Sequence, residues 1–304
     1  MSRRMKFWGR LATAILALGI VGSVILTIAI GHFASAPAAA TIGDGPPELA
    51  AENVRIVSQS GATLAGWYVA GRPGAGAVVL LHGVRANRWS MVRRAMMLKE
   101  TGIAALLIDF QAHGESTGAR ITFGHREGMD AHAAVAWLRQ RLPAEHIGAI
   151  GSSLGGAAAL LGPGPLAVDA LVIESVYADI EMAIANRVRS IAGAIVGPAL
   201  GNFIALPVAK LFQLVVPPIL DINPAALRPI DRIAEVKAPI LVASGLRDEL
   251  ASVEEAKALF ARAQSPKTLW MVEGVGHFDL EGSVPDEYRQ HVLAFLVEHL
   301  GAKR

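Results

Sequence analysis

The chain is predicted to fold as an α/β protein around a mostly parallel sheet, and three observations lead to this prediction. Short apolar runs alternate along the chain with longer amphipathic segments. The runs are continuously apolar, which is typical of strands covered on both faces. Near the middle, Gly151-Ser152-Ser153-Leu154-Gly155 follows one such run and opens into an alanine-rich stretch. This pattern indicates a strand, a tight turn with a serine at its apex, and a helix.

The remaining elements follow in order along the chain. Two short β-type runs joined through Ser60-Gly61 predict a hairpin. We expect strands at 54–57, 63–69, 77–81, 104–108, 147–150, 171–173, 240–243 and 268–272, and helices at 89–100, 126–141, 252–263 and 285–300. Strands that alternate with helices predict a parallel sheet with helices on both faces, here within a domain spanning residues 51–304.

One segment interrupts this alternation. Residues 176–237 are apolar and contain several prolines: Pro198, Pro207, Pro217 and Pro218. We expect an inserted helical cap over the functional site. A second membrane span at 190–219 is the alternative, and Pro207 and Lys210 within that stretch argue against it.

The N-terminus is predicted to be a membrane anchor. Residues 11–31 are uncharged and almost entirely apolar, and about 20 such residues cross a bilayer as a helix. Residues 1–10 are basic, which places them in the cytoplasm and the main domain on the other side. Residues 32–50, rich in Ala, Pro and Gly, are expected to be a linker. Cleavage near the small residues 34–38, which would release a secreted form, is the alternative.

Charge and composition exclude several classes of function. Four of the 28 basic residues lie in the first ten positions, so the rest of the chain carries 24 basic and 26 acidic residues. A nearly neutral main domain argues against nucleic acid as its partner. The chain contains no cysteine, which excludes disulfides, thiolate metal sites and a cysteine nucleophile. We expect no metal or organic cofactor.

Polar residues follow several predicted strands at the edge where parallel strands present reactive groups. Ser153 follows 147–150, Asp248 lies after 240–243, and His277 lies after 268–272. A serine hydroxyl needs a base, and a histidine base needs a carboxylate to orient it. Ser153, His277 and Asp248 supply these three parts, and Glu174 is the alternative for the acid. The backbone N–H of Leu154, at the helix start, is a candidate oxyanion donor.

These motifs resemble the α/β-hydrolase fold superfamily, in particular its serine-aminopeptidase-like and prolyl-oligopeptidase-like branch. The resemblance covers about residues 54–300 and depends on the serine turn and on four further motifs: Leu81-His82-Gly83, residues 109–116, Gly245-Leu246-Arg247-Asp248 and Gly276-His277-Phe278. It implies Ser153 as nucleophile, Asp248 as acid, His277 as base, and the N–H groups of Val84 and Leu154 as oxyanion donors. The motif at residues 109–116 departs from the usual family pattern at Ala112, the position directly before His113-Gly114. In the family this loop has a structural role.

Nearby residues have simpler interpretations. His82 is expected to be a hydrogen-bonded turn residue rather than a metal ligand, and His113 and Glu115 are expected to lock their loop. Four arginines at the start of the predicted helix 89–100 are expected to form a solvated face, with carboxylate binding as the alternative: Arg85, Arg88, Arg93 and Arg94.

The expected function is that of a membrane-anchored serine hydrolase that cleaves a small-molecule carboxylic ester through an acyl-enzyme. The apolar cap favours an apolar acyl or alcohol group. Hydrolysis of peptides or amides is the alternative within the same fold. The alternative from another class is a catalytically silent, membrane-tethered binding module.

Overall fold

A computed structural model describes residues 3–220, 223–277 and 280–301. Its main feature is an eight-stranded sheet with the strand order β10-β9-β8-β7-β4-β5-β3-β2. All neighbours from β10 to β5 are parallel, and β3 is antiparallel to both β5 and β2. The strands are β2 (Glu52–Val57), β3 (Thr63–Val69), β4 (Ala77–Leu81), β5 (Ala104–Ile108), β7 (Ile147–Ser152), β8 (Ala170–Glu174), β9 (Ile240–Gly245) and β10 (Lys267–Val272). The predicted mostly parallel sheet is thus confirmed.

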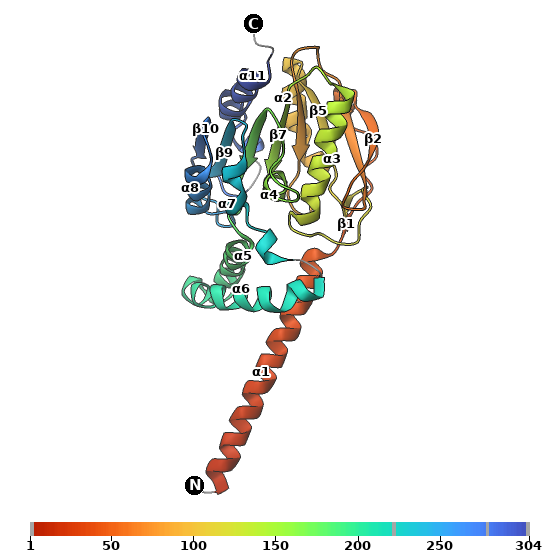
Figure 1. Cartoon of the computed structure of the whole chain (residues 1–304). Coiled ribbons are helices and arrows are strands. Elements are labelled where there is room, and N and C mark those ends of the chain that lie inside the picture. Colours follow the sequence, from red (N-terminus) through yellow and green to blue (C-terminus); the bar gives the residue numbers. More distant parts are fainter. Residues whose placement is uncertain (1–2, 221–222, 278–279, 302–304) are drawn as a thin grey trace.

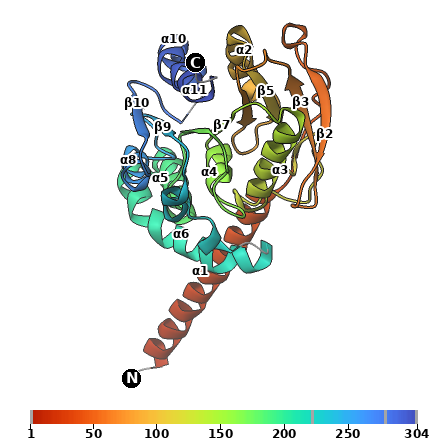
Figure 2. The same ribbon diagram turned by 45° about the horizontal axis from the view of Figure 1, so that its top comes forward.

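Helices cover both faces of this sheet (Figures 1 and 2). On one face lie α3 (His125–Arg141), α4 (Leu154–Leu160) and α8 (Val253–Arg262). On the other lie α2 (Val92–Thr101) and the C-terminal helix, in which α10 (Pro285–Tyr288) and α11 (Ala294–Leu300) flank the π-helical turn Arg289–Leu293. The predicted helix at 89–100 begins as a 3₁₀ turn, Arg88–Met91, capped by the side chain of Asn87.

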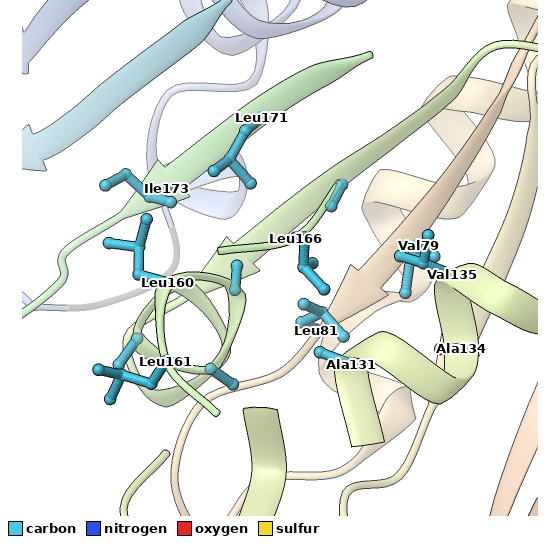
Figure 3. Packing of buried hydrophobic residues seen from close by; sticks show 14 of the residues in the cluster. Val79, Leu81, Ala131, Ala134, Val135, Leu160, Leu161, Leu166, Leu171 and Ile173 are labelled. Carbon is cyan, nitrogen blue, oxygen red and sulfur yellow. The ribbon is translucent and has the colours of Figure 1, made fainter. Parts of the chain in front are cut away.

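The core divides into two clusters because successive strand residues point to opposite faces. Val79 and Leu81 of β4 pack toward α3 and α4, together with Leu171 and Ile173 of β8 (Figure 3). The intervening residues of the same strands pack toward α2 and the C-terminal helix. Strands buried on both faces explain why the sequence shows continuous apolar runs rather than alternation.

The N-terminal helix α1 (Arg3–Ser35) is one continuous element that extends away from the sheet, and its C-terminal end contacts α6 (Figure 1). It crosses the predicted boundaries at residues 10 and 31. In the residues that the structure describes, no helix has both the length and the apolar character needed to cross a membrane. The transmembrane anchor at 11–31 stays a prediction of the sequence.

The predicted linker at 32–50 is attached to the domain rather than free. Its first residues belong to α1, and β1 (Ala38–Ala39) pairs in parallel with β6 (His113–Gly114). The N–H groups of Ile42 and Gly43 both donate to Glu115 Oε1 at 2.9 Å. The segment predicted as a linker therefore makes ordered contacts with the domain that follows it.

Helices fill the insertion between β8 and β9. The main elements of this cap, residues 176–237, are α5 (Ile180–Val196), α6 (Pro198–Leu220) and α7 (Pro229–Arg232). Helices α5 and α6 pack against each other. Glycine permits this at Gly201, where a Cβ atom would lie 2.8 Å from the backbone nitrogen of Gly193. Both helices lie at the end of the domain from which α1 emerges (Figure 1).

Candidate active site

Ser153 occupies a strained turn between β7 and α4. Its backbone has φ 51° and ψ −111°, in the left-handed half of conformational space that favours glycine. Its neighbours must be small, since a Cβ at Gly155 would lie 2.1 Å from the backbone oxygen of Leu81. The Ser153 N–H donates to the Glu174 carbonyl at 2.8 Å, which ties the turn to the adjacent strand. The side chain is thereby held at the edge of the sheet.

The structure brings together the three side chains that the sequence singled out. Ser153 Oγ lies 3.0 Å from His277 Nε2. His277 Nδ1 lies 3.0 and 2.9 Å from Asp248 Oδ1 and Oδ2. A proton on Nδ1 donates to the carboxylate and leaves the Nε2 lone pair to accept from the serine hydroxyl. This geometry suits removal of the serine proton by the imidazole.

Asp248 is held as a carboxylate. Its side chain is fully buried, and burial by itself raises the pKa of a carboxyl group. The hydrogen bond from His277 and those from the backbone N–H groups of Ala251 (2.8 Å) and Leu250 (2.9 Å) outweigh burial and leave the pKa of Asp248 below its usual value. A charged Asp248 can then stabilise a protonated imidazole at His277.

The two predicted oxyanion donors lie beside the serine. Leu154 is the first residue of α4, where a helix leaves its N–H groups without an intrahelical acceptor. Val84 follows Gly83, and a Cβ at Gly83 would lie 3.7 Å from the Ser153 Cβ. Within the part of the chain that the structure describes, the N–H groups of Val84 and Leu154 make no hydrogen bond to protein. Both residues line the same cavity as Ser153 and His277.

This cavity has a volume of about 510 Å³ and opens onto Ser153 and His277. Its walls come from the cap helices α5 and α6, from the loops that follow the strands, and from the C-terminal turns of α1. Most of the lining side chains are apolar, among them Ile30, Phe123, Ile184, Val188 and Phe212. A volume of this size is typical of small-molecule sites.

The alternative acid, Glu174, is engaged elsewhere. Its carboxylate pairs with the guanidinium of Arg94 at 2.6 Å and accepts a hydrogen bond from Tyr288. Both Glu174 and Arg94 are 1% exposed. A buried charge needs such a partner. Glu174 therefore has a structural role, and Asp248 is the carboxylate on His277.

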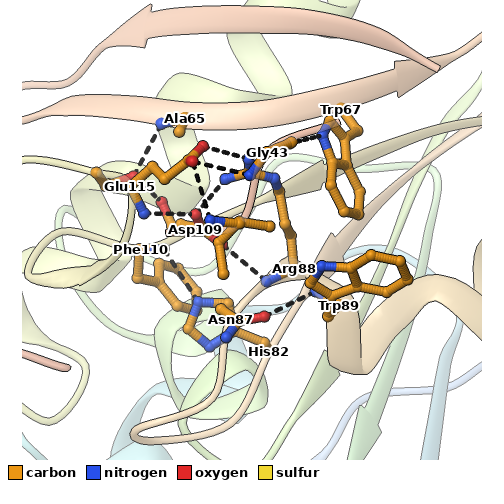
Figure 4. A network of polar contacts seen from close by, with 12 residues as sticks. Gly43, Ala65, Trp67, His82, Asn87, Arg88, Trp89, Asp109, Phe110 and Glu115 are labelled. Carbon is orange, nitrogen blue, oxygen red and sulfur yellow. Dashed lines mark hydrogen bonds and ion pairs between the residues drawn. The ribbon is translucent and has the colours of Figure 1, made fainter. Parts of the chain in front are cut away.

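The prediction of a solvated arginine face was wrong for two of its members, because Arg88 is buried as well as Arg94. Arg88 pairs with Asp109 and, at 2.5 Å, with Glu115 (Figure 4). Asp109 also accepts from the backbone N–H of Arg88 at 2.7 Å and of Glu115 at 2.9 Å. The hydrogen bond from Arg88 is the main cause that lowers the pKa of Glu115 to about 2.

His82 is a hydrogen-bonded turn residue, as predicted. Its Nδ1 lies 2.7 Å from the Gly83 carbonyl, and its Nε2 accepts from the N–H of Phe110 at 3.1 Å (Figure 4). Burial, together with the nearby His113, lowers the pKa of His82 to about 3, so the ring is neutral. His113 locks its loop through Gln111 and Arg85. Among the described residues, no three His, Asp or Glu side chains gather as metal ligands.

Two contributors to the site were not found by sequence reasoning. Helix α1 supplies part of the cavity wall, although it is far from Ser153 in the sequence. Arg85 is solvent-exposed, as expected, and its guanidinium also donates to the carbonyl groups of Phe33 (3.4 Å) and Ala36 (3.2 Å) at the end of α1. No pattern in the sequence indicates that the C-terminal end of α1 lies against this loop.

The sheet topology, the cap and the serine–histidine–aspartate arrangement define an α/β hydrolase. A profile of the Alpha/beta hydrolase family matches residues 78–291, and the chain belongs to this family. The match is to the family as a whole and assigns no branch within it.

Several known proteins are similar to this chain. An uncharacterized protein of Mycobacterium tuberculosis is 31% identical over 240 residues, which cover 76% of this chain and 74% of the relative. The alpha/beta hydrolase domain-containing protein WAV2 of Arabidopsis thaliana is 28% identical over 83% of this chain and 80% of its own. The esterase Pf2001 of Pyrococcus furiosus superposes with a TM-score of 0.71 and 25% identity, over 88% of this chain and 98% of the esterase.

Proposed function

We propose that the protein is a serine hydrolase that cleaves carboxylic esters with an apolar acyl or alcohol group. The observation that carries this proposal is the continuous set of hydrogen bonds from Asp248 through His277 to Ser153, which ends in an apolar cavity. The similarity to the esterase Pf2001 of Pyrococcus furiosus supports an ester as substrate.

The proposed reaction proceeds in two steps. Ser153 Oγ attacks the ester carbonyl carbon while His277 accepts the serine proton. The oxyanion that forms is stabilised by the N–H groups of Val84 and Leu154. His277 then gives its proton to the departing alcohol, which leaves an acyl-enzyme. Water, deprotonated by His277, attacks the acyl carbon, and release of the carboxylic acid restores Ser153.

Two other functions use the same fold. A peptidase or amidase would need the same residues, and a panel of matched esters, amides and thioesters distinguishes it from an esterase. A catalytically silent binding module would not need a serine poised against a histidine, so the 3.0 Å contact between Ser153 and His277 favours the enzyme. Attachment to a membrane through residues 11–31 and an extracytoplasmic domain stay predictions of the sequence.

Substitution of the nucleophile tests the proposal. We expect Ser153→Ala to lower kcat for p-nitrophenyl esters by roughly 10⁴-fold or more, because only the oxyanion donors and substrate binding would remain. Wild type should react covalently with a fluorophosphonate probe at Ser153, as should the matched control Ser152→Ala, which removes the adjacent hydroxyl. Wild-type protein that neither reacts with the probe nor hydrolyses any ester would support the binding module instead.

A further inference from the structure

We propose that the last turns of α1 select the apolar chain of the substrate, so that the N-terminal helix is a specificity element of the active site. This inference rests on the proposed ester hydrolysis at Ser153. It assigns to residues 27–34 a wall against which an acyl or alcohol chain lies, next to the cap helix α6 that α1 contacts.

One face of α1 builds this wall. Thr27, Ile30 and Ala34 are spaced three and four residues apart, so they lie on the same side of the helix, and Phe33 flanks them. All four line the cavity that contains Ser153 and His277. The cap contributes apolar side chains to the same cavity: Ile184 and Val188 from α5, and Val208 and Phe212 from α6. A substrate chain in this cavity therefore contacts three helices from two distant parts of the sequence.

The wall is fixed relative to the reacting atoms. Arg85 directly follows the oxyanion donor Val84, and its guanidinium donates to the carbonyls of Phe33 and Ala36 and lies 5.3 Å from the centre of the Phe33 ring. A cation at the C-terminal end of a helix also interacts favourably with the helix dipole. The Arg85 N–H donates to His113 Nε2 at 3.0 Å, which anchors the other side of the loop.

The chain segment after α1 adds a second attachment. The N–H of Ala38 donates to the Ala112 carbonyl at 2.8 Å, and the N–H of Ile121 donates to the Ser35 carbonyl at 2.8 Å. The end of α1 is thus joined both to the oxyanion loop and to the loop that follows β5. Because these attachments fix its position, a change in the size of a wall side chain alters the cavity rather than merely shifting the helix.

The test compares two isoleucines on the same helix. Ile30 lines the cavity and is 49% exposed, whereas Ile25 does not line it and is 62% exposed. In wild type, kcat/KM for a p-nitrophenyl ester series from acetyl to decanoyl should rise about fourfold for each methylene that the cavity buries. We expect Ile30→Ala to lower kcat/KM about tenfold for the decanoyl ester and less than twofold for acetyl. Ile25→Ala should leave the whole profile unchanged.

A second variant changes the wall in the opposite sense. Ala34→Phe puts a larger side chain on the wall and so reduces the volume of the cavity. We expect it to move the optimum to shorter chains while activity on the acetyl ester is retained. Activity on the acetyl ester also shows that each variant is folded. Equal chain-length profiles for wild type, Ile30→Ala and Ala34→Phe would overturn the role of α1 while Ser153 still reacts with the fluorophosphonate. Loss of both hydrolysis and labelling in wild type would instead overturn the proposed function, and this inference with it.

Discussion

His82 shows how a single buried side chain supports the site without taking part in the reaction. It is fully buried at the end of β4, and its two ring nitrogens bind the Gly83 carbonyl and the Phe110 N–H. The N–H of Phe110 needs an unprotonated Nε2 as its acceptor. The ring must therefore stay neutral for this loop, which leads to Val84, to keep its hydrogen bonds.

The low pKa of His82 predicts a loss of stability in acid. The pKa of His82 in the folded protein, about 3, is below its unfolded value of 6.5. The contribution of neutral His82 to the free energy of unfolding is therefore complete above pH 6.5 and is lost as the pH falls from 6.5 toward 3. Between pH 7 and pH 5 this loss amounts to about 2 kcal/mol. We expect the free energy of unfolding, measured with urea, to decrease more over this pH range in wild type than in His82→Gln, whose side chain cannot titrate. Equal decreases in the two proteins would contradict the assignment.

The turn from β7 to α4 is the element on which the proposed chemistry depends. Gly151 and Gly155 are both required by close approach, since a Cβ on either would lie within 2.5 Å of backbone atoms. Backbone atoms cannot move aside as a flexible side chain can. The glycines of the motif are thus explained by packing against Leu81 and against the turn itself.

Gly155→Ala should therefore disturb both stability and activity. We expect the free energy of unfolding to fall by about 1–3 kcal/mol, since the new methyl group meets the Leu81 carbonyl. The matched control is Gly193→Ala in α5, where the nearest atom to the new Cβ would be 3.8 Å away. The control should be at least as stable as wild type, because alanine favours helix. Urea unfolding checks both, and equal effects would contradict the steric explanation.

At the scale of the whole molecule, the ends of the sheet strands, the cap and the end of α1 meet on one side of the domain (Figures 1 and 2). Residues from all three regions line one cavity. Helix α1 then continues beyond this meeting point, with several large apolar side chains exposed along it: Phe7, Trp8, Leu18, Val21 and Ile25. The sequence around them predicts a basic cytoplasmic end and a main domain on the other side of a membrane.

A reporter fused to the C-terminus tests this location. We expect a C-terminal alkaline phosphatase fusion to be active, because this reporter matures only outside the cytoplasm, and a matched cytoplasmic reporter to be inactive. Replacement of the basic residues Arg3, Arg4, Lys6 and Arg10 by neutral residues should weaken this orientation. Activity only from the cytoplasmic reporter would refute both the orientation and the anchor.

The local pattern of apolar and polar residues was sufficient to predict much of the fold. Strands such as 77–81 and 104–108 were predicted with their observed bounds, because a strand buried on both faces needs an unbroken apolar run. Ser153, Asp248 and His277 could be selected because each follows a strand, and the carboxyl ends of parallel strands meet at one edge. Burial of Arg88 and Arg94 could not be foreseen, since their partners, Asp109 and Glu174, are brought near only by the sheet.

The sequence by itself determined the strand and helix order, the serine turn and the candidates for nucleophile, base and acid, because these depend on short-range steric and periodic rules. Only the tertiary structure decided which carboxylate reaches His277 and that α1 forms a wall of the cavity. Such contacts join residues far apart in the chain. They depend on how whole helices pack, and no local pattern of residues encodes that packing.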